Sequence, residues 1–213
     1  MADTHYESRV DALAGAWRVW AELGGTLSPE EWRAPSRCPG WRVADLYAHH
    51  SAFPVALAGS PPPAPEEAPA GLLSAVDILR GFNRPGGPAH EMAGAVADMA
   101  AEEAARTGQA ELLKRFSVTA PSAIAALRGA DPGMLIGWPA TGGRVSLVEA
   151  LRIILTEATV HLLDVQRALS REPYIPAEAL RETAVLLAEV ADPVDFVEAA
   201  TGRSAKPVLP VLR

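Results

Sequence analysis

Apolar residues recur every three or four positions along much of the chain, and no stretch shows the sustained apolar–polar alternation of a strand. The spacing predicts helices over residues 6–23, 42–57, 90–106, 110–127, 146–169 and 176–190. Weaker signals predict a short helical turn around Trp32 and a helical segment over 70–82. The clearest apolar stripe lies on the helix that begins at Ser146, where the residues within about 40° of one line are Leu151, Leu155, Ala158, Leu162, Val165 and Leu169.

Proline and glycine mark most of the breaks between these segments. The chain has 19 prolines and 17 glycines, and most of them lie between the periodic stretches. We therefore expect loops over 60–69 and 131–143, and an extended tail over the last twenty residues. Four or more amphipathic helices with long connections predict an all-α antiparallel four-helix bundle with Pro/Gly-rich connections and a short helical C-terminal extension.

Local signals predict where several helices begin and where two of them are disturbed. Ser28 with Glu31, and Ser146 with Glu149, have the spacing of a capping box, in which each side chain bonds to the other residue's backbone N–H. A proline inside a helix removes one backbone hydrogen bond, so we expect a kink or an early end at such positions. These prolines are Pro54 and Pro121.

Composition excludes several classes of protein. The chain of 213 residues is 49% hydrophobic, carries a formal net charge of -7 and is long enough to bury a sizeable core. An acidic chain lacks the basic face of a general nucleic-acid or anionic-membrane binder. No apolar run reaches the roughly 18 residues of a spanning helix, and the polar start has no secretory pattern. With Cys38 as its single cysteine, the chain is expected to be a cytoplasmic protein without an internal disulfide.

A carboxylate and an imidazole lie one turn apart on the strongest predicted helix. Glu157 and His161 are four residues apart and border its apolar stripe, with Asp164 one turn further along. Glu oxygen and His nitrogen both bind divalent metals at about 2.0–2.2 Å. A histidine of the adjacent pair His49 and His50 could complete such a site from another helix. Two histidines and one carboxylate leave coordination positions open, which is typical of catalytic sites.

The residues alone leave simpler interpretations open. Glu and His at this spacing are common on solvated helix faces, and Asp164 could be a surface charge. Inward-facing histidines such as His49 or His50 are often hydrogen-bonded core residues. A helix start could activate the Cys38 thiol, but no histidine is near it in the sequence, which favours an inert role. Trp32, Trp41 and Trp138 are expected in packing, and the glycine pairs match no nucleotide-binding motif.

Two longer blocks resemble a known family. Residues 32–49, WRAPSRCPGWRVADLYAH, resemble the start of the mycothiol-dependent maleylpyruvate isomerase family, within the wider DinB/YfiT-like superfamily, where the motif ends in a metal-binding histidine. Residues 143–164, GRVSLVEALRIILTEATVHLLD, resemble the block that supplies the family's Glu and His ligands. The resemblance implies a DinB-like metal-binding bundle over residues 1–170 and a C-terminal helix and tail over 171–213, in place of a full second domain.

The resemblance also implies a set of metal ligands. By position in the two blocks, the ligands are His49, Glu157 and His161, and His50 is not one of them. Zinc is the preferred metal of the family, although two histidines and one carboxylate also suit iron or nickel. Asp164 resembles a residue that recurs at this position in the family. We expect it to orient a metal ligand or to take part in helix packing, and not to bind the metal itself.

The function that follows from the resemblance is activation of a small thiol. Family enzymes use a low-molecular-weight thiol, mycothiol, which would be held as a thiolate for S-transfer to a small electrophile or for its isomerisation. The isomerase's second domain is not expected in this chain, which favours a transferase. The alternatives are a non-catalytic metal- or ligand-binding DinB-like module, and a bundle whose His and Glu residues are incidental. The last alternative predicts His49 and His161 more than about 8 Å apart, too far to share a metal.

Overall fold

The computed structural model of the protein describes residues 4–59, 72–138, 143–204 and 207–212. The expected loop over 60–69 lies outside this range. In chain order, the helices and strands are α1 (Thr4–Gly24), α2 (Pro29–Arg33), α3 (Val43–Ala58), β1 (Leu72–Leu73), α4 (Ala75–Asn83), α5 (Pro88–Glu91), α6 (Ala93–Thr107), α7 (Gln109–Lys114), the π-helix η1 (Arg115–Thr119), α8 (Ala120–Arg128), β2 (Leu135–Trp138), β3 (Gly143–Ser146), α9 (Leu147–Ala168), α10 (Ala177–Val190) and α11 (Pro193–Ala200). The structure is therefore mostly helical, as the apolar spacing predicts.

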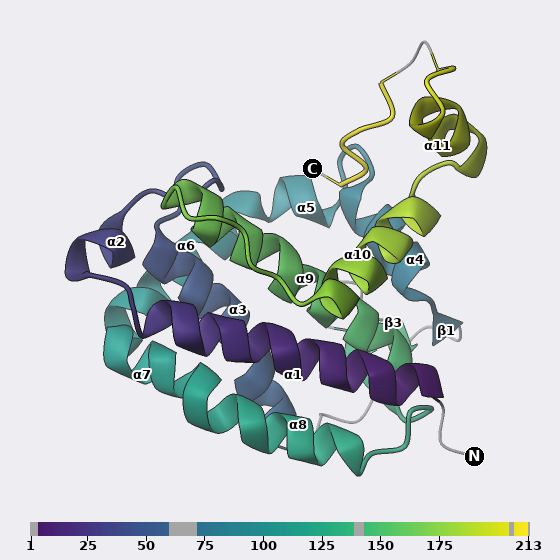
Figure 1. Ribbon diagram of the computed structural model, residues 1–213. Helices are drawn as coiled ribbons and strands as arrows, with labels where there is room; N and C mark the ends of the chain where they lie inside the picture. Colours follow the sequence, from purple (N-terminus) through teal and green to yellow (C-terminus); the bar gives the residue numbers. More distant parts are fainter. Residues whose placement is uncertain (1–3, 60–71, 139–142, 205–206, 213) are drawn as a thin grey trace.

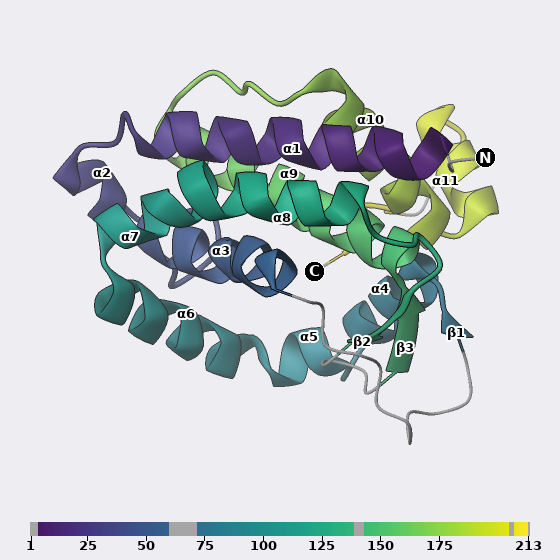
Figure 2. The ribbon, with the colours of Figure 1, turned by 90° about the horizontal axis from the view of Figure 1, so that it is seen from below.

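Helices α1, α3, α8 and α9 surround the main core. α1 packs on α8 and α9, and α3 packs on the same two helices. In Figures 1 and 2, α1 and α9 run in one direction, whereas α3 and α8 run in the other. α6 packs along α3, and α10 packs against α9, α1 and α4. None of the helices in the described ranges is both long and apolar enough to cross a membrane.

Trp20 of α1 lies at the centre of the aromatic core. Its ring is stacked on Phe116 and meets the ring of Tyr47 edge-on, with centroid distances of 5.2 and 4.7 Å. Its indole N–H donates to the carbonyl of Ala158 in α9 at 3.0 Å, and its own carbonyl accepts from the Tyr47 hydroxyl of α3 at 3.0 Å. One buried side chain thus fixes α9 and α3 to α1 at neighbouring points.

No strand was expected from the apolar spacing, and the small three-stranded sheet corrects that expectation. Its order is β1-β3-β2, with β1 parallel and β2 antiparallel to β3. β2 and β3 lie in the region 131–143 and just after it, where a loop was expected. Strands of two and four residues are too short to show an alternating pattern. Ile136 and Val145 nevertheless pair in the register and are buried in the core.

Pro54 and Pro121 both lie within continuous helical segments. α3 continues past Pro54 to Ala58, so the helix does not end early. The chain also stays helical from α7 through α8, and the π-helix η1 comes directly before Ala120 and Pro121. Proline cannot donate to the carbonyl four residues back, and the wider π-turn accommodates this loss of a hydrogen bond.

One of the two expected capping boxes forms. The Ser28 hydroxyl accepts from the backbone N–H of Glu31, and the Glu31 carboxylate accepts from that of Ser28, at 3.2 and 2.8 Å. The second box is absent, because Ser146 makes no side-chain cap. Glu149 instead accepts from the backbone N–H of Ala75 at 2.7 Å, so it satisfies the start of α4.

The C-terminal part of the described chain contains more helix than expected. α10 has nearly the predicted bounds, but α11 forms where the sequence predicted an extended tail. Asp192 caps α11 by accepting from two backbone N–H groups, and Pro193 occupies its first turn. The end of α10 is held by Arg80 of α4, whose guanidinium donates to the carbonyls of residues 189–191 at 2.9 to 3.1 Å.

An ion-pair network joins the π-helix to α3 and α6. Arg115 donates to the Ser51 hydroxyl at 3.2 Å and to the Glu103 carboxylate at 2.7 Å. Glu103 also accepts from Thr107 at 2.8 Å and pairs with Arg106. The hydrogen bond from Arg115 lowers the pKa of Glu103 from 4.5 to about 2. The charged form of Glu103 therefore stabilises the packing of α6.

We expect Glu103→Gln to destabilise the protein in a pH-dependent way. Because folding lowers the pKa of Glu103, its contribution is present above about pH 4.5 and is lost as the pH falls towards 2. The free energy of unfolding should fall by about 1–2 kcal/mol at neutral pH, and the difference from wild type should vanish near about pH 2. Urea unfolding at several pH values measures this difference. Glu102→Gln, at the exposed neighbouring position, is the control variant. A destabilisation by Glu103→Gln that does not depend on pH would contradict the stabilising role of the Glu103 carboxylate.

Candidate functional site

Three potential metal ligands converge where α3 meets α9. His49 comes from α3, and Glu157 and His161 come from successive turns of α9. Nε2 of His161 lies 3.2 Å from the Glu157 carboxylate, and Nε2 of His49 lies 3.8 Å from the same oxygen. The two imidazole rings are 5.4 Å apart and nearly perpendicular. This distance contradicts the separation of more than about 8 Å expected if these residues were incidental.

The donor set has the chemistry and spacing of a divalent metal site. One nitrogen from each imidazole and one carboxylate oxygen all lie within 4.8 Å of one another. Tetrahedral zinc with bonds of about 2.0–2.1 Å places its ligand atoms roughly 3.3 Å apart, so small side-chain movements suffice. The side chains of His49, Glu157 and His161 are 28%, 32% and 17% exposed, which leaves access for a further ligand.

The imidazoles control the charge of Glu157. Burial by itself raises the pKa of this carboxyl group, but hydrogen bonds with His161 and His49 outweigh burial and leave its pKa well below the usual value. Glu157 is therefore a carboxylate at neutral pH, which is the form that binds a metal.

The second nitrogen of His161 faces another pair of side chains. Nδ1 lies 3.2 Å from the Asp164 carboxylate, and the Cys38 thiol donates to the same carboxylate oxygen at 3.6 Å. As the imidazolium, His161 donates from Nδ1 to Asp164 and from Nε2 to Glu157; a metal bound at Nε2 would displace the Nε2 proton and leave the Nδ1 proton facing Asp164. Burial lowers the pKa of His161, but hydrogen bonds with Asp164, Cys38 and Glu157 raise it well above the usual value.

The position of Cys38 is the feature that sequence reasoning missed. The thiol was expected to be inert because no histidine is near it in the sequence, yet the loop before α3 brings it to the Asp164 side of His161. Cys38, His161 and Asp164 also offer three ligand atoms within 4.8 Å of one another. A separation of 126 residues between Cys38 and Asp164 gives no local pattern from which this contact could be inferred.

His50 belongs to the core and lies outside the candidate ligand set. Its side chain is fully buried, and Nε2 accepts a hydrogen bond from the indole N–H of Trp17 at 2.9 Å. Its ring lies nearly parallel to the rings of both Trp20 and Phe116, at centroid distances of 5.1 and 5.8 Å. Burial and then the nearby His161 lower the pKa of His50 well below the usual value, so it is neutral.

The expected packing tryptophans divide between the core and the site. Trp32 is buried against Tyr47, with ring centroids 4.4 Å apart. Trp41, which precedes α3, meets the ring of His49 edge-on at 5.2 Å, so it restricts the orientation of a candidate ligand. Trp138 lies in β2, is half-buried and packs against the core.

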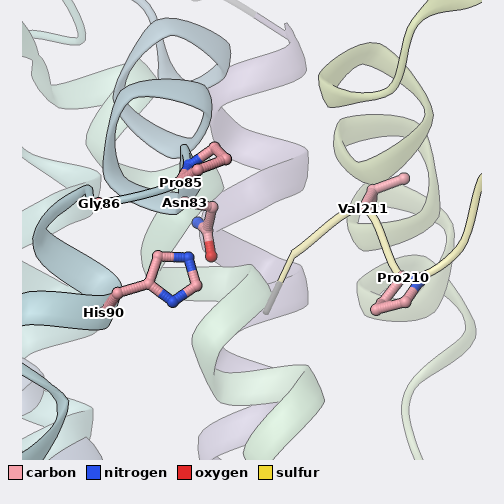
Figure 3. A pocket seen from close by; sticks show the side chains of 6 residues that line it. All are labelled: Asn83, Pro85, Gly86, His90, Pro210 and Val211. Carbon is pink, nitrogen blue, oxygen red and sulfur yellow. The ribbon is translucent and has the colours of Figure 1, made fainter.

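Of two hollows on the described part of the surface considered for binding, one adjoins the candidate ligands. It has a volume of about 460 Å³, lies between α3 and α6, and includes His49 in its wall. The other, of about 590 Å³, lies between the α4–α5 region and the C-terminal segment (Figure 3). Its lining residues are Asn83, Pro85, Gly86, His90, Pro210 and Val211. This second hollow therefore includes none of the three converging ligands.

Comparison with known families agrees with the two sequence blocks. The family model described as the mycothiol maleylpyruvate isomerase N-terminal domain matches residues 13–166, which is most of the chain. The chain belongs to this family. The match includes His49, Glu157 and His161 and ends just after Asp164. No curated protein and no solved structure matches the chain. Membership in this domain family therefore links the chain to mycothiol-related, DinB-like proteins.

We expect Asp164→Asn to weaken zinc binding by about 10- to 100-fold while the protein stays folded. The amide accepts a weaker hydrogen bond from Nδ1 of His161, so the imidazole is less firmly oriented and less basic. Competition with a fluorescent chelator measures the zinc affinity. Asp11→Asn, which removes an exposed carboxylate paired with Arg128, is the matched control and should bind zinc like wild type. Unchanged affinity in Asp164→Asn would show that this carboxylate has no supporting role.

Proposed function

We propose that this family member is a metal-dependent enzyme that activates a low-molecular-weight thiol, mycothiol, for reaction with a small electrophile. The observation that supports the proposal best is the convergence of two imidazole nitrogens and one carboxylate oxygen at a partly exposed position. Family membership supports mycothiol as the thiol. We also propose that α1, α3, α8 and α9 correspond to the family's four-helix bundle.

In this proposal His49, Glu157 and His161 hold a divalent metal, with zinc preferred. A bound divalent metal supplies Lewis acidity that lowers the pKa of a thiol from its ordinary value of about 8.5. Asp164 keeps the proton of His161 on Nδ1, so that Nε2 stays available, and Trp41 limits rotation of His49. The ligand geometry thus depends on side chains outside the donor set.

The reaction with an activated alkene has a simple balance. The thiol gives its proton to water, and its sulfur forms a bond to one alkene carbon as the C=C π bond breaks. The electron pair moves to the neighbouring carbon, which takes a proton from water. Release of this adduct is S-transfer, whereas rotation followed by loss of the thiol is isomerisation. Both outcomes share the first addition, so the ligand set supports either.

Metal content and adduct formation test the proposal together. We expect about one zinc per chain after loading, and loss of most of it in His161→Ala with the fold retained. The zinc-loaded wild type should form mycothiol adducts with model electrophiles, and His161→Ala should not. Elemental analysis, circular dichroism and mass spectrometry of the products measure the three properties. His90→Ala, which removes an exposed histidine of α5, is the matched control.

Two outcomes would contradict parts of the proposal. Wild-type protein that stays metal-free after incubation with zinc would contradict the metal site itself. Zinc-loaded protein that never forms or isomerises an adduct would instead favour a non-catalytic metal-binding module.

A further inference from the structure

The groove between α3 and α6 connects the candidate metal ligands to an apolar surface. Among the three ligands, His49 lines this groove, whose volume is about 460 Å³. The remaining lining residues are Ala48, Ala52, Val96, Met99, Ala100, Glu102, Glu103 and Arg106. A volume of this size accommodates a small organic molecule. A molecule bound in the groove would therefore lie against His49.

One part of the groove is apolar and shaped by small side chains. Ala48 and Ala100 are buried, so they let α3 and α6 approach closely and form a shallow floor. Met99 is 56% exposed although its helix packs along α3. Its flexible, polarisable side chain can adapt to ligands of different shapes. Met99 therefore offers an accessible apolar side chain to a molecule in the groove.

The charged part of the groove has no surplus of positive charge. Glu103 is neutralised by Arg115 at 2.7 Å, and it also pairs with Arg106. Glu102 adds an exposed carboxylate to the same wall. The lining itself holds two carboxylates and one guanidinium group, while Arg115 pairs with Glu103 from outside the lining, so the wall has no excess of positive charge. Such a wall offers an anionic substrate little attraction and disfavours it beside Glu102.

We propose that this groove binds the body of the electrophilic substrate and that it selects uncharged, apolar electrophiles over anionic ones. The inference rests on the proposed function, because it takes the reaction to occur beside His49. Met99 is the specificity-determining residue: its side chain covers the apolar body while the electrophilic carbon lies next to His49.

Binding can be tested without turnover through the methionine methyl groups. The chain has four methionines, so protein labelled with ¹³C at the methionine methyl groups gives few signals. Benzylacetone is an uncharged apolar ketone that lacks a reactive alkene and serves as the probe. We expect a saturable shift of the Met99 signal, with little change in Met92, which is also exposed but lies outside the groove. A Met99 signal that shifts no more than Met92 would overturn the proposal.

Selectivity can be tested with a reactive analogue and a charge introduced into the groove. Benzylideneacetone, the activated alkene related to benzylacetone, should react with mycothiol at least about tenfold more efficiently in kcat/KM than its para-carboxylate. Met99→Glu should lower kcat/KM for benzylideneacetone about tenfold by raising KM, with the zinc content unchanged. Met99→Leu keeps an apolar side chain and should have a kcat/KM close to that of the wild type. Val118→Glu changes a side chain of the same 56% exposure on η1 and should have no effect.

The two experiments separate this inference from the proposed function. A saturable Met99 shift without adduct formation would support the groove and contradict the enzymatic function. Adduct formation that is unaffected by Met99→Glu, or that is equally efficient with the para-carboxylate, would support the function and overturn the groove as the electrophile site.

Discussion

The hydrogen bonds of Trp20 hold together the two helices that carry the candidate ligands. The indole N–H binds the carbonyl of Ala158, the residue after Glu157, and the Trp20 carbonyl binds Tyr47, two residues before His49. Because this tryptophan is fully buried, loss of its side chain would leave a cavity and remove the indole bond to α9, whereas the bond from Tyr47 is to the backbone carbonyl. Trp20 thus contributes to the relative position of α3 and α9, and with it to the distance between the candidate ligands.

The site itself works against stability unless its charges are paired. The Glu157 carboxylate faces Nε2 of both His49 and His161. The Asp164 carboxylate faces the other ring nitrogen of His161, Nδ1. Partly buried charges are costly to bring together unless they are hydrogen-bonded or bind a metal. Hydrogen bonds among these side chains offset that cost, and the same arrangement holds the donor atoms that a divalent metal would need.

The sequence predicts the helices, and the clustering of three candidate side chains, better than it predicts the connections. Helical spacing placed most of the helices, and the two family blocks singled out His49, Glu157 and His161, which lie together in the structure; metal binding by them stays a prediction. The sheet could not be predicted because its strands are too short to show an alternating pattern. The capping box of Ser146 and Glu149 could not be excluded from local spacing, because the Glu149 carboxylate binds the backbone N–H of Ala75 at the start of a helix distant in the sequence. The contact between Cys38 and Asp164 likewise depends on tertiary packing, which cannot be predicted from the local sequence pattern.

X-ray absorption of the zinc-loaded protein shows which side chains bind the metal, because His161 has possible co-ligands on both sides. Binding by His49, Glu157 and His161 predicts nitrogen and oxygen ligands at about 2.0–2.1 Å, with the multiple scattering of two imidazoles. Binding on the opposite side of His161, by Cys38 and Asp164, would add a sulfur at about 2.3 Å in the absence of any added thiol. A sulfur ligand, or scattering from a single imidazole, would contradict the account.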